Sequence, residues 1–329
     1  MAAVMPPEWA AHERTLMGWP CRRELWGGEL EAAKEQYAGV ANAIAAFEPV
    51  TMVVPDAAGA AEARPVLTEA VSLVELAIDD SWLRDSGPIF TLEEETGARA
   101  AVQFGFNGWG EKFRPFDQDA TIATRLCEQL GEPVERSGLI LEGGSIGVDG
   151  TGFLVTTEQC LLHPSRNPDR SRLEIEEELR ARLGVREIVW LGLGLLEDRD
   201  TDGHVDLIAA FTGPGELLLQ AVGPEDPNHD AMEENRLRAE AAGLTVTSFP
   251  LLPRLEVAGE QIVASYLNFY VGSDFVIVPT AGVAEDADAL ARIAAAYPAQ
   301  EVVGVPGEVI AYGGGGPHCI TQQVPAVRD

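Results

Sequence analysis

A run of four glycines, residues 313–316, lies directly before Pro317, His318 and Cys319. Consecutive glycines lose conformational entropy on folding and pack no side chain, so the run predicts a close backbone approach or an unusual turn. Cys319 then begins a β-type run, which could present its thiol at a strand end as a nucleophile. A small buried cysteine beside a flexible loop would give the same pattern. The glycine spacing fits no phosphate-binding loop, and no helix is expected after it.

His204 and Asp206 stand at the start of an apolar run that continues to Phe211. A strand over 205–211 would place both polar side chains on one face, because side chains alternate along a strand. A histidine and a carboxylate so placed could serve as an acid–base group and its charge partner. They could also be a structural pair or two metal ligands. The other histidines show no ligand spacing, which weighs against a metal: His12, His163, His229 and His318.

Two further carboxylates stand beside turns. Asp85 belongs to residues 79–88, a segment with three aspartates, a tryptophan and a turn, which by itself is typical of a solvated loop. Glu142 follows the apolar residues 139–141 and precedes two glycines, which leave room for another group to approach. Each is a weak signal alone, so their meaning depends on the elements that position them.

These elements alternate between helices and short strands. Apolar residues recur every three or four positions in five segments, which predicts helices there: 30–47, 122–130, 173–183, 232–242 and 287–297. Short β-type runs lie between them: 51–54, 71–78, 152–157, 187–191, 205–211, 261–269, 275–278 and 301–305. This alternation is typical of an α/β fold.

A structural period of about sixty residues also runs along the chain. Polar or glycine-rich clusters recur at steps of 57, 62, 64 and 51 residues, marked by Asp85, Glu142, His204, Asn268 and Cys319. A radial array of small α/β modules would bring the inner end of every module to one central site. An ordinary open α/β sheet is the alternative on the pattern alone. No linker rich in proline, serine or glycine divides residues 1–329, so we expect one domain.

The charge of the chain bears on its partners. With 23 Lys and Arg against 53 Asp and Glu, the formal charge is −30. Such a field repels a phosphate backbone, and no basic patch is visible, so we expect no nucleic-acid partner. It attracts small cations such as amines and guanidinium compounds, although a salt-adapted surface would have the same composition. No apolar stretch is long enough to cross a bilayer, so we expect no membrane partner.

The cysteines indicate the compartment. Cys21, Cys127, Cys160 and Cys319 are too few and too scattered for a disulfide scaffold, and no two of them form a Cys-x-x-Cys pair. The first residues lack a basic region followed by an apolar core, so we expect no secretory signal. The expected protein is cytoplasmic, with free thiols, and the sequence leaves assembly into a homo-oligomer open.

Taken together, the clusters resemble those of the agmatine deiminases and the related bacterial peptidylarginine deiminases. The motifs run in order along the whole chain: Met5-Pro6-Pro7-Glu8-Trp9, His12-Glu13-Arg14, Gly18-Trp19-Pro20, Trp82-Leu83-Arg84-Asp85-Ser86-Gly87-Pro88, Phe106-Asn107-Gly108-Trp109-Gly110, Leu141-Glu142-Gly143-Gly144, Asp202-Gly203-His204-Val205-Asp206 and His318-Cys319-Ile320-Thr321-Gln322-Gln323. Their joint occurrence is highly specific.

The resemblance implies the pentein fold, a five-bladed α/β propeller, which agrees with the period of about sixty residues. It also implies a role for each site residue: Cys319 as nucleophile, His204 as acid–base group, Asp85 and Asp206 as guanidinium ligands, Glu142 as a supporting carboxylate, and Trp82 and Trp109 as neighbours of the substrate. The implied reaction hydrolyses agmatine, a small cationic guanidino compound, to N-carbamoylputrescine and ammonia through an S-amidino-cysteine.

This chemistry explains the residue types. Paired carboxylates hold a guanidinium by charge-assisted hydrogen bonds and stabilise its positive charge as the carbon becomes tetrahedral. A thiolate is a strong nucleophile, and a nearby cation lowers the pKa of its thiol. The imidazole of His204 would protonate departing ammonia and then take a proton from the attacking water. We therefore expect no metal and no cofactor.

One departure concerns the substrate. The deiminases that this chain resembles usually have Asn and Ile where it has Gly316 and Pro317, and proline restricts the residue before it to extended conformations. Peptidyl arginine, free arginine or another guanidinoalkylamine are therefore alternatives to agmatine. Two other classes are an amidinotransferase and a non-catalytic pentein that only binds a partner. The thiol, imidazole and carboxylates at the motif positions argue against the non-catalytic alternative.

Overall fold

Five sheets repeat one order of elements in the computed structural model of the chain, which describes residues 3–327. In each sheet two antiparallel strands come first, a helix follows, and a third strand pairs parallel to the second. The helices bury their apolar faces against strands of their own and of neighbouring sheets. The repeat confirms the predicted α/β class and agrees with the expected five-bladed propeller.

Three of these sheets follow one another along the chain. The first contains β1 (Ala3–Val4), β5 (Ile89–Glu93), β6 (Arg99–Gly105) and β7 (Val134–Ile140), with α6 (Asp119–Leu130) before β7. The second contains β8 (Ile146–Val148), β9 (Phe153–Thr157) and β10 (Glu187–Leu191), with α8 (Arg172–Leu183). The third contains β11 (Ala209–Gly213), β12 (Glu216–Gln220) and β13 (Thr245–Phe249), with α9 (His229–Ala241).

The last two sheets complete a ring. The fourth contains β16 (Tyr270–Val271), β17 (Phe275–Thr280) and β18 (Glu301–Pro306), with α10 (Asp286–Ala296). The fifth contains β19 (Thr321–Pro325), β2 (His12–Gly18), β3 (Val50–Val54) and β4 (Val71–Glu75), with α2 (Leu30–Ile44) and α3 (Ala57–Ala63). Because β19 pairs antiparallel with β2, the last strand of the described chain closes the ring onto one of the first.

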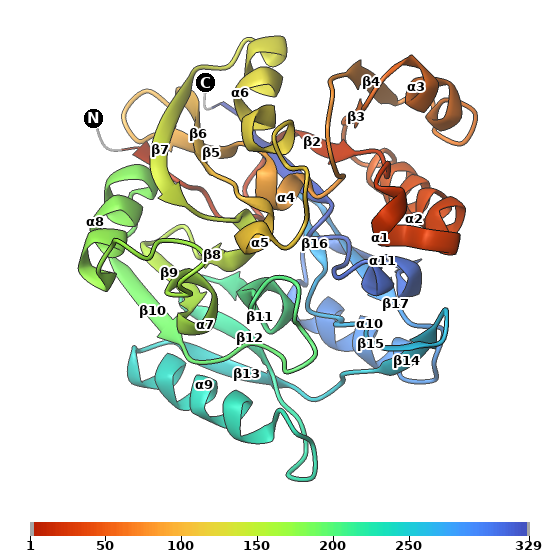
Figure 1. Cartoon of the computed structure of the whole chain (residues 1–329). Coiled ribbons are helices and arrows are strands. Elements are labelled where there is room, and N and C mark those ends of the chain that lie inside the picture. The colour runs from red at the N-terminus through yellow and green to blue at the C-terminus, as the bar shows by residue number, and fades with distance from the viewer. Residues whose placement is uncertain (1–2, 328–329) are drawn as a thin grey trace.

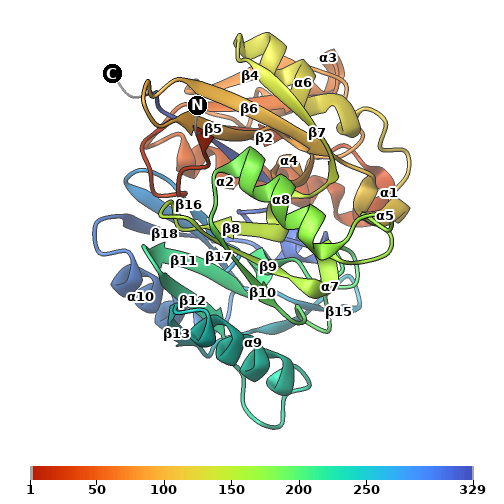
Figure 2. The same ribbon diagram turned by 90° about the vertical axis from the view of Figure 1, so that its left-hand side faces the viewer.

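Figure 1 shows these sheets following one another around a common centre in the order of the colour bar. Helices α8 and α9 lie on the outer side of their sheets (Figure 2). The short helices are α1 (Arg23–Trp26), α4 (Leu83–Ser86), α5 (Gly108–Glu111), α7 (Glu158–Leu161) and α11 (Glu308–Tyr312), with 3₁₀ turns η1 (Gly27–Glu29), η2 (Gly143–Ser145) and η3 (Val205–Leu207). A separate hairpin joins β14 (Arg254–Val257) and β15 (Glu260–Val263). Figure 1 places α4 and α5 near the middle of the ring.

The five helices predicted from apolar spacing are all present, and their ends have local causes. At the start of α8, Ser171 and Glu174 form a reciprocal capping box that satisfies backbone N–H groups. The helix ends at Gly184, whose φ of 66° is left-handed and therefore suits glycine. Within residues 3–327, no helix has both the length and the apolar character that crossing a membrane would take.

Three strand predictions are wrong in part. The strand predicted over 71–78 ends at Glu75, and the one predicted over 261–269 ends at Val263. The apolar run at 205–211 begins as the 3₁₀ turn η3, and β11 starts only at Ala209. Val205 and Ile208 are nevertheless fully buried. Hydrophobicity had predicted the burial correctly, but a short apolar run does not reveal whether its backbone forms a strand.

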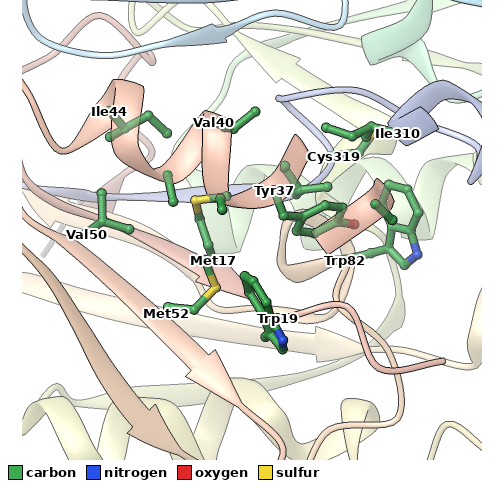
Figure 3. Packing of buried hydrophobic residues seen from close by; sticks show 14 of the residues in the cluster. Met17, Trp19, Tyr37, Val40, Ile44, Val50, Met52, Trp82, Ile310 and Cys319 are labelled. Carbon is green, nitrogen blue, oxygen red and sulfur yellow. The ribbon is translucent and has the colours of Figure 1, made fainter. Parts of the chain in front are cut away.

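The largest apolar cluster packs α2 against its sheet and reaches the centre of the ring. Figure 3 shows Val40 and Ile44 of α2 on one side of Met17 and Met52. Cys319 belongs to the same buried cluster. The candidate nucleophile is therefore held in a packed core, which gives its side chain a defined position.

Candidate active site

Five short segments reach the centre of the ring, one just before the first strand of each sheet. Each carries one residue of the predicted period: Asp85 before β5, Glu142 before β8, His204 before β11, Asn268 before β16 and Cys319 before β19. Equivalent positions of five sheets therefore supply five polar side chains to one place. This explains why the steps between them lie near sixty residues.

Cys319 and Asp206 are in direct contact. The thiol donates to Oδ2 of Asp206 at 3.3 Å, and the backbone N–H of Cys319 donates to Oδ1 of Asn268 at 3.3 Å. Oδ2 of Asp206 also accepts from Nδ1 of His318 at 2.8 Å, while Nε2 of His318 lies 2.7 Å from Oε1 of Glu8. The chain Glu8–His318–Asp206 therefore ends on the candidate nucleophile.

The charges of Asp206 and His318 stabilise each other. Burial alone would raise the pKa of Asp206, but the hydrogen bond and the charge of His318 lower it below the ordinary aspartate value. Burial and Arg84 act to lower the pKa of His318, yet Glu8 and Asp206 on its two sides raise it. Both ring nitrogens face carboxylate oxygens, so both carry protons. Asp206 is thus an anion beside an imidazolium.

Within the described residues, the hydrogen-bond donors to Asp85 are neutral. Its Oδ1 accepts from the backbone N–H of Gly144 at 2.9 Å, and its Oδ2 accepts from Nε1 of Trp109 at 2.8 Å. Burial raises the pKa of Asp85; the nearby His204 acts to lower it, but the carboxylates of Asp206 and Glu142 add to the rise. A buried carboxylate is stabilised when a cation pairs with it, so Asp85 is suited to bind a positively charged group.

Gly144 marks the point where three of these groups meet. A Cβ atom there would lie 2.7 Å from Nδ1 of His204, 2.8 Å from Oδ2 of Asp206 and 2.9 Å from Oδ1 of Asp85. Only glycine leaves room for the three polar atoms to converge. This confirms the prediction that the glycines after Glu142 permit a close approach.

His204 lies between two carboxylates. Its Nδ1 is 3.9 Å from Oδ1 of Asp85, its Nε2 is 4.0 Å from Oε2 of Glu142, and neither ring nitrogen forms a hydrogen bond within the described residues. The prediction that His204 and Asp206 share a strand face is wrong, because Asp206 lies in the η3 turn and His204 is the residue before that turn. The turn still directs both side chains to Gly144.

Glu142 is fully buried and is held by Arg166. Nε of Arg166 donates to Oε1 of Glu142 at 2.6 Å, and the same guanidinium reaches Asp202 at 2.9 Å. This ion pair fixes one oxygen of Glu142, while Oε2 has no hydrogen-bond partner in the described chain and faces His204. Arg166 lies in a turn 24 positions after Glu142, and no sequence motif predicts its place here.

A cavity opens beside Cys319. Its lining is largely aromatic and acidic: Leu25, Asp80, Trp82, Asp85, Trp109, Phe113, Asp200, Thr201, Gly313, Gly314 and Cys319. No lysine or arginine belongs to this described lining. Trp82 is held by stacking on Trp26, with ring centroids 5.8 Å apart. Residues 79–88 are therefore not the solvated loop that they suggest in isolation, since Trp82 and Asp85 are buried.

Trp109 reaches Asp85 from an unusual turn. Gly108, Trp109, Gly110 and Glu111 have φ angles of 62°, 53°, 78° and 68°, so four consecutive residues are left-handed. A residue with a Cβ atom pays roughly 1–2 kcal/mol for this conformation. A side chain at Gly110 would overlap Ser165. The strained turn places the indole N–H against the Asp85 carboxylate. Strained backbone of this kind is often found at functional sites.

The glycine run before the nucleophile is also a close approach, as predicted. A Cβ atom at Gly315 would lie 2.7 Å from Cβ of Cys319, and one at Gly313 would overlap the ring of Trp26. At Gly316 it would lie 2.7 Å from Oδ1 of Asn268, the oxygen that holds the Cys319 backbone. Glycine at 316 therefore leaves Asn268 in place.

The structure thus brings together the seven residues that the sequence singled out: Cys319, His204, Glu142, Asp85, Asp206, Trp82 and Trp109. Sequence reasoning did not find the contributions of Glu8 and Arg166. Each reaches the centre from a distant segment, so no local spacing could reveal it.

Comparison with known proteins shows which family has this sequence and this fold. The family model for Porphyromonas-type peptidyl-arginine deiminases matches residues 4–325. Agmatine deiminase of Pseudomonas aeruginosa (strain LESB58) is 38% identical, covering 98% of this chain and 96% of its own. The structure of agmatine deiminase of Enterococcus faecalis superposes with a TM-score of 0.94 at 32% identity, covering 99% of this chain and 97% of its own. A substrate-bound agmatine deiminase of C. jejuni gives 0.92 at 25% identity, with the same coverage.

Proposed function

Because the chain belongs to the Porphyromonas-type peptidyl-arginine deiminase family, we propose that it hydrolyses agmatine to N-carbamoylputrescine and ammonia. The enzyme is then a hydrolase acting on a C–N bond of a linear amidine. One observation carries the proposal: the Cys319 thiol meets the carboxylate of Asp206 beside a cavity that Asp85 also lines. A planar cation between two carboxylates and next to a thiol is the arrangement that guanidinium chemistry requires.

The substrate itself would activate the nucleophile. Burial raises the pKa of Cys319 well above the ordinary value for a thiol, and the charges of Asp206 and Asp85 add to that rise. A guanidinium bound by these carboxylates neutralises both of them and brings a positive charge to the sulfur. The thiol then loses its proton to solvent and attacks the guanidino carbon as a thiolate.

His204 would carry the protons of the remaining steps. As imidazolium it donates a proton to the departing amino group, and ammonia leaves an S-amidino group on Cys319. Neutral His204 then takes a proton from water, whose oxygen attacks the amidino carbon. Collapse of the adduct breaks the C–S bond and releases the ureido product. Glu142 lies 4.0 Å from Nε2 of His204. None of these steps calls for a metal or redox cofactor.

The far end of the cavity favours agmatine over arginine. Free arginine ends in an α-carboxylate, for which a basic partner is needed, and the described lining holds no lysine or arginine. Two further aspartates line the cavity: Asp80, which pairs with Arg22 at 2.7 Å, and Asp200, which is exposed at the Gly314 side of the opening. The guanidinium of agmatine would therefore meet Asp85, and its ammonium would meet Asp200.

Steady-state assays test the substrate. Agmatine, arginine, an arginine-containing peptide and a series of guanidinoalkylamines are compared, with ammonia and the ureido product measured and no amine acceptor added. We expect kcat/KM for agmatine to exceed that for arginine and the peptide. Equal values would remove the agmatine assignment and leave only deiminase chemistry. Turnover that appears only with an added amine acceptor would indicate an amidinotransferase, and no turnover of any compound a non-catalytic pentein.

We further propose that residues 1–329 act as one catalytic unit in the cytoplasm, without a nucleic-acid or membrane partner. Each of the five sheets contributes one residue to the centre, which supports a single unit. The four cysteines are free, as is typical of reducing compartments, and the charge of −30 disfavours nucleic acid.

A further inference from the structure

Behind His204 lies a cluster that includes Cys160, a cysteine with no part in the steps described above. Glu142, Cys160 and His204 each offer one ligand atom, and these atoms all lie within 4.8 Å of one another. All three side chains are fully buried. Cys160 belongs to α7, whose first turn is capped by Thr157, and the hydroxyl of Thr157 also donates to the backbone oxygen of Gly203. The thiol is thereby fixed relative to the segment that carries His204.

Three atoms in this cluster have no hydrogen-bond partner among the described residues, and two of them face each other. Oε2 of Glu142 and Nε2 of His204 are buried and form no hydrogen bond among the described residues, although they are 4.0 Å apart. A buried polar group without a partner costs about 1–3 kcal/mol. Nδ1 of His204, which is also without a partner in the described residues, faces Asp85, and Asp85 lines the cavity. A bound substrate can therefore supply the hydrogen-bond partner of Nδ1. Nε2 and Oε2 face away from Asp85, and the substrate does not account for them.

The donor set suits one class of ligand. A thiolate, an imidazole nitrogen and a carboxylate oxygen are the ligands that Zn²⁺ prefers. In a tetrahedral zinc site ligand atoms lie about 3.5 Å apart, so atoms that lie within 4.8 Å of one another need to approach by about 1.3 Å at most. Arg166 already holds the other oxygen of Glu142, which orients Oε2 as outer partners orient metal ligands.

We propose that Glu142, Cys160 and His204 form an inhibitory Zn²⁺ site behind the acid–base imidazole. Zn²⁺ replaces the thiol proton of Cys160, which is released to solvent, and binds Oε2 of Glu142 and Nε2 of His204, with water as fourth ligand. No oxidant or reductant takes part. The ion lies on the side of the ring away from Asp85, so it leaves the guanidinium site open.

Zn²⁺ bound to Nε2 of His204 would lower the catalytic rate. An imidazole that gives its Nε2 lone pair to a metal cannot take up a second proton, so it cannot act as an imidazolium acid near neutral pH. Zinc bound here lowers kcat and leaves KM nearly unchanged. Zinc bound to Cys319 in the cavity would instead compete with the substrate. This effect on the rate rests on the proposed role of His204, whereas the binding of metal does not.

Binding is tested first, in the Cys319→Ser protein, which lacks the nucleophilic thiol. Titration with Co²⁺ is followed by the thiolate-to-cobalt charge-transfer absorption, and titration with Zn²⁺ by calorimetry. We expect one equivalent to bind with a thiolate band. Adding Cys160→Ala or the size-conserving Cys160→Ser removes the band, while Cys127→Ala, a control at another buried cysteine, keeps it. A band that survives both changes at Cys160, or no band in Cys319→Ser itself, overturns the proposal.

The rate is tested second, in the enzyme with Cys319 intact. The rate of each variant in zinc is divided by its own rate in chelator. A change in metal-free activity therefore does not affect the measured inhibition. We expect zinc to lower kcat without raising KM, chelator to restore it, and Cys160→Ala to need at least tenfold more zinc for half inhibition. Inhibition that raises KM and is equal in both proteins would place the metal at Cys319. If agmatine is not the substrate, the cobalt titration still decides the site.

Discussion

Two buried histidines lie near Asp206, and they differ in their partners. His318 has both ring nitrogens on carboxylate oxygens, at 2.8 and 2.7 Å. His204 has no hydrogen bond within the described chain, although it is at least as deeply buried. Most buried polar groups are paired, and an unpaired one needs an explanation. The paired histidine stabilises the charge of the site, and the unpaired one is available to a substrate.

The two carboxylates of the cavity show the same contrast. Burial raises the pKa of Asp85, whose donors in the described part of the chain are neutral, whereas His318 keeps the pKa of Asp206 low despite its burial. Equal burial therefore gives opposite shifts, according to whether a cation is already present. If this comparison holds, substitution of His204 should lower the catalytic rate. Substitution of His318 or Glu8 should instead change the ionisation of Asp206 or the stability of the fold.

The largest effect is expected at the thiol. Cys319→Ser should lower kcat at least ~10⁴-fold, because the covalent intermediate is lost, while the melting temperature stays near that of the parent. Cys127→Ser, at a buried cysteine far from the cavity, serves as control. Mass spectrometry of the quenched parent reaction should show an S-amidino adduct on Cys319. An adduct on Cys21, Cys127 or Cys160 would contradict the assignment.

The next effect is expected at the unpaired histidine. His204→Asn should lower kcat by about 10²–10⁴-fold with little change in KM, since general acid–base catalysis contributes that much and the guanidinium ligands remain. Steady-state kinetics with agmatine measures both constants. Near-parental kcat would show that His204 is structural and that the comparison of the two histidines fails.

A smaller effect is expected at the paired histidine. His318→Gln removes the cation that keeps Asp206 ionised, so the pKa of Asp206 should rise and kcat/KM at neutral pH should fall about 10–100-fold, the value of one or two charged hydrogen bonds. Activity should recover in part as the pH is raised, because Asp206 then loses its proton. A loss that is the same at every pH would mean that His318 only packs.

The smallest effect on rate, and a separate effect on stability, is expected at Glu8. Burial acts to raise its pKa, but His318 and Arg84 lower it to about 2. A lowered pKa gives stability that is present above the unfolded value near 4.5 and is lost as the pH falls toward 2. Over this window the parent should lose about 3 kcal/mol of unfolding free energy relative to Glu8→Gln. Denaturant unfolding of both proteins at several pH values measures it, and parallel curves would exclude Glu8 as the source.

The sequence predicts those parts of the molecule that have a local cause. The ends of α8 follow from Ser171 and Gly184, and the period from Asp85 to Cys319 follows from one repeated position in five sheets. The backbone at Val205 was predicted wrongly, because a short apolar sequence is equally compatible with a strand and with a buried turn. Period, motif and resemblance were enough to select the seven site residues.

The partners of those residues could not be predicted. Glu8 lies 310 positions from His318, and nothing near Arg166 indicates that it will hold Glu142. The unpaired state of His204 is also a tertiary property, since it depends on which groups fail to reach the ring. Sequence patterns select residue types, but the pairing of charges is decided only when distant segments meet.

The ring closes by pairing Thr321 of β19 with Met17 of β2, which are 304 positions apart. Loop-closure entropy grows only with the logarithm of loop length, so closing this loop instead of one of sixty residues costs about 1.4 kcal/mol more. The kinetic consequence is larger, because contacts between distant segments form late in folding. Cys319 lies two residues before β19, so its thiol joins Asp85, Glu142 and His204 only when that last sheet forms. Recovery of activity during refolding should therefore report completion of the ring, lagging behind signals from single blades.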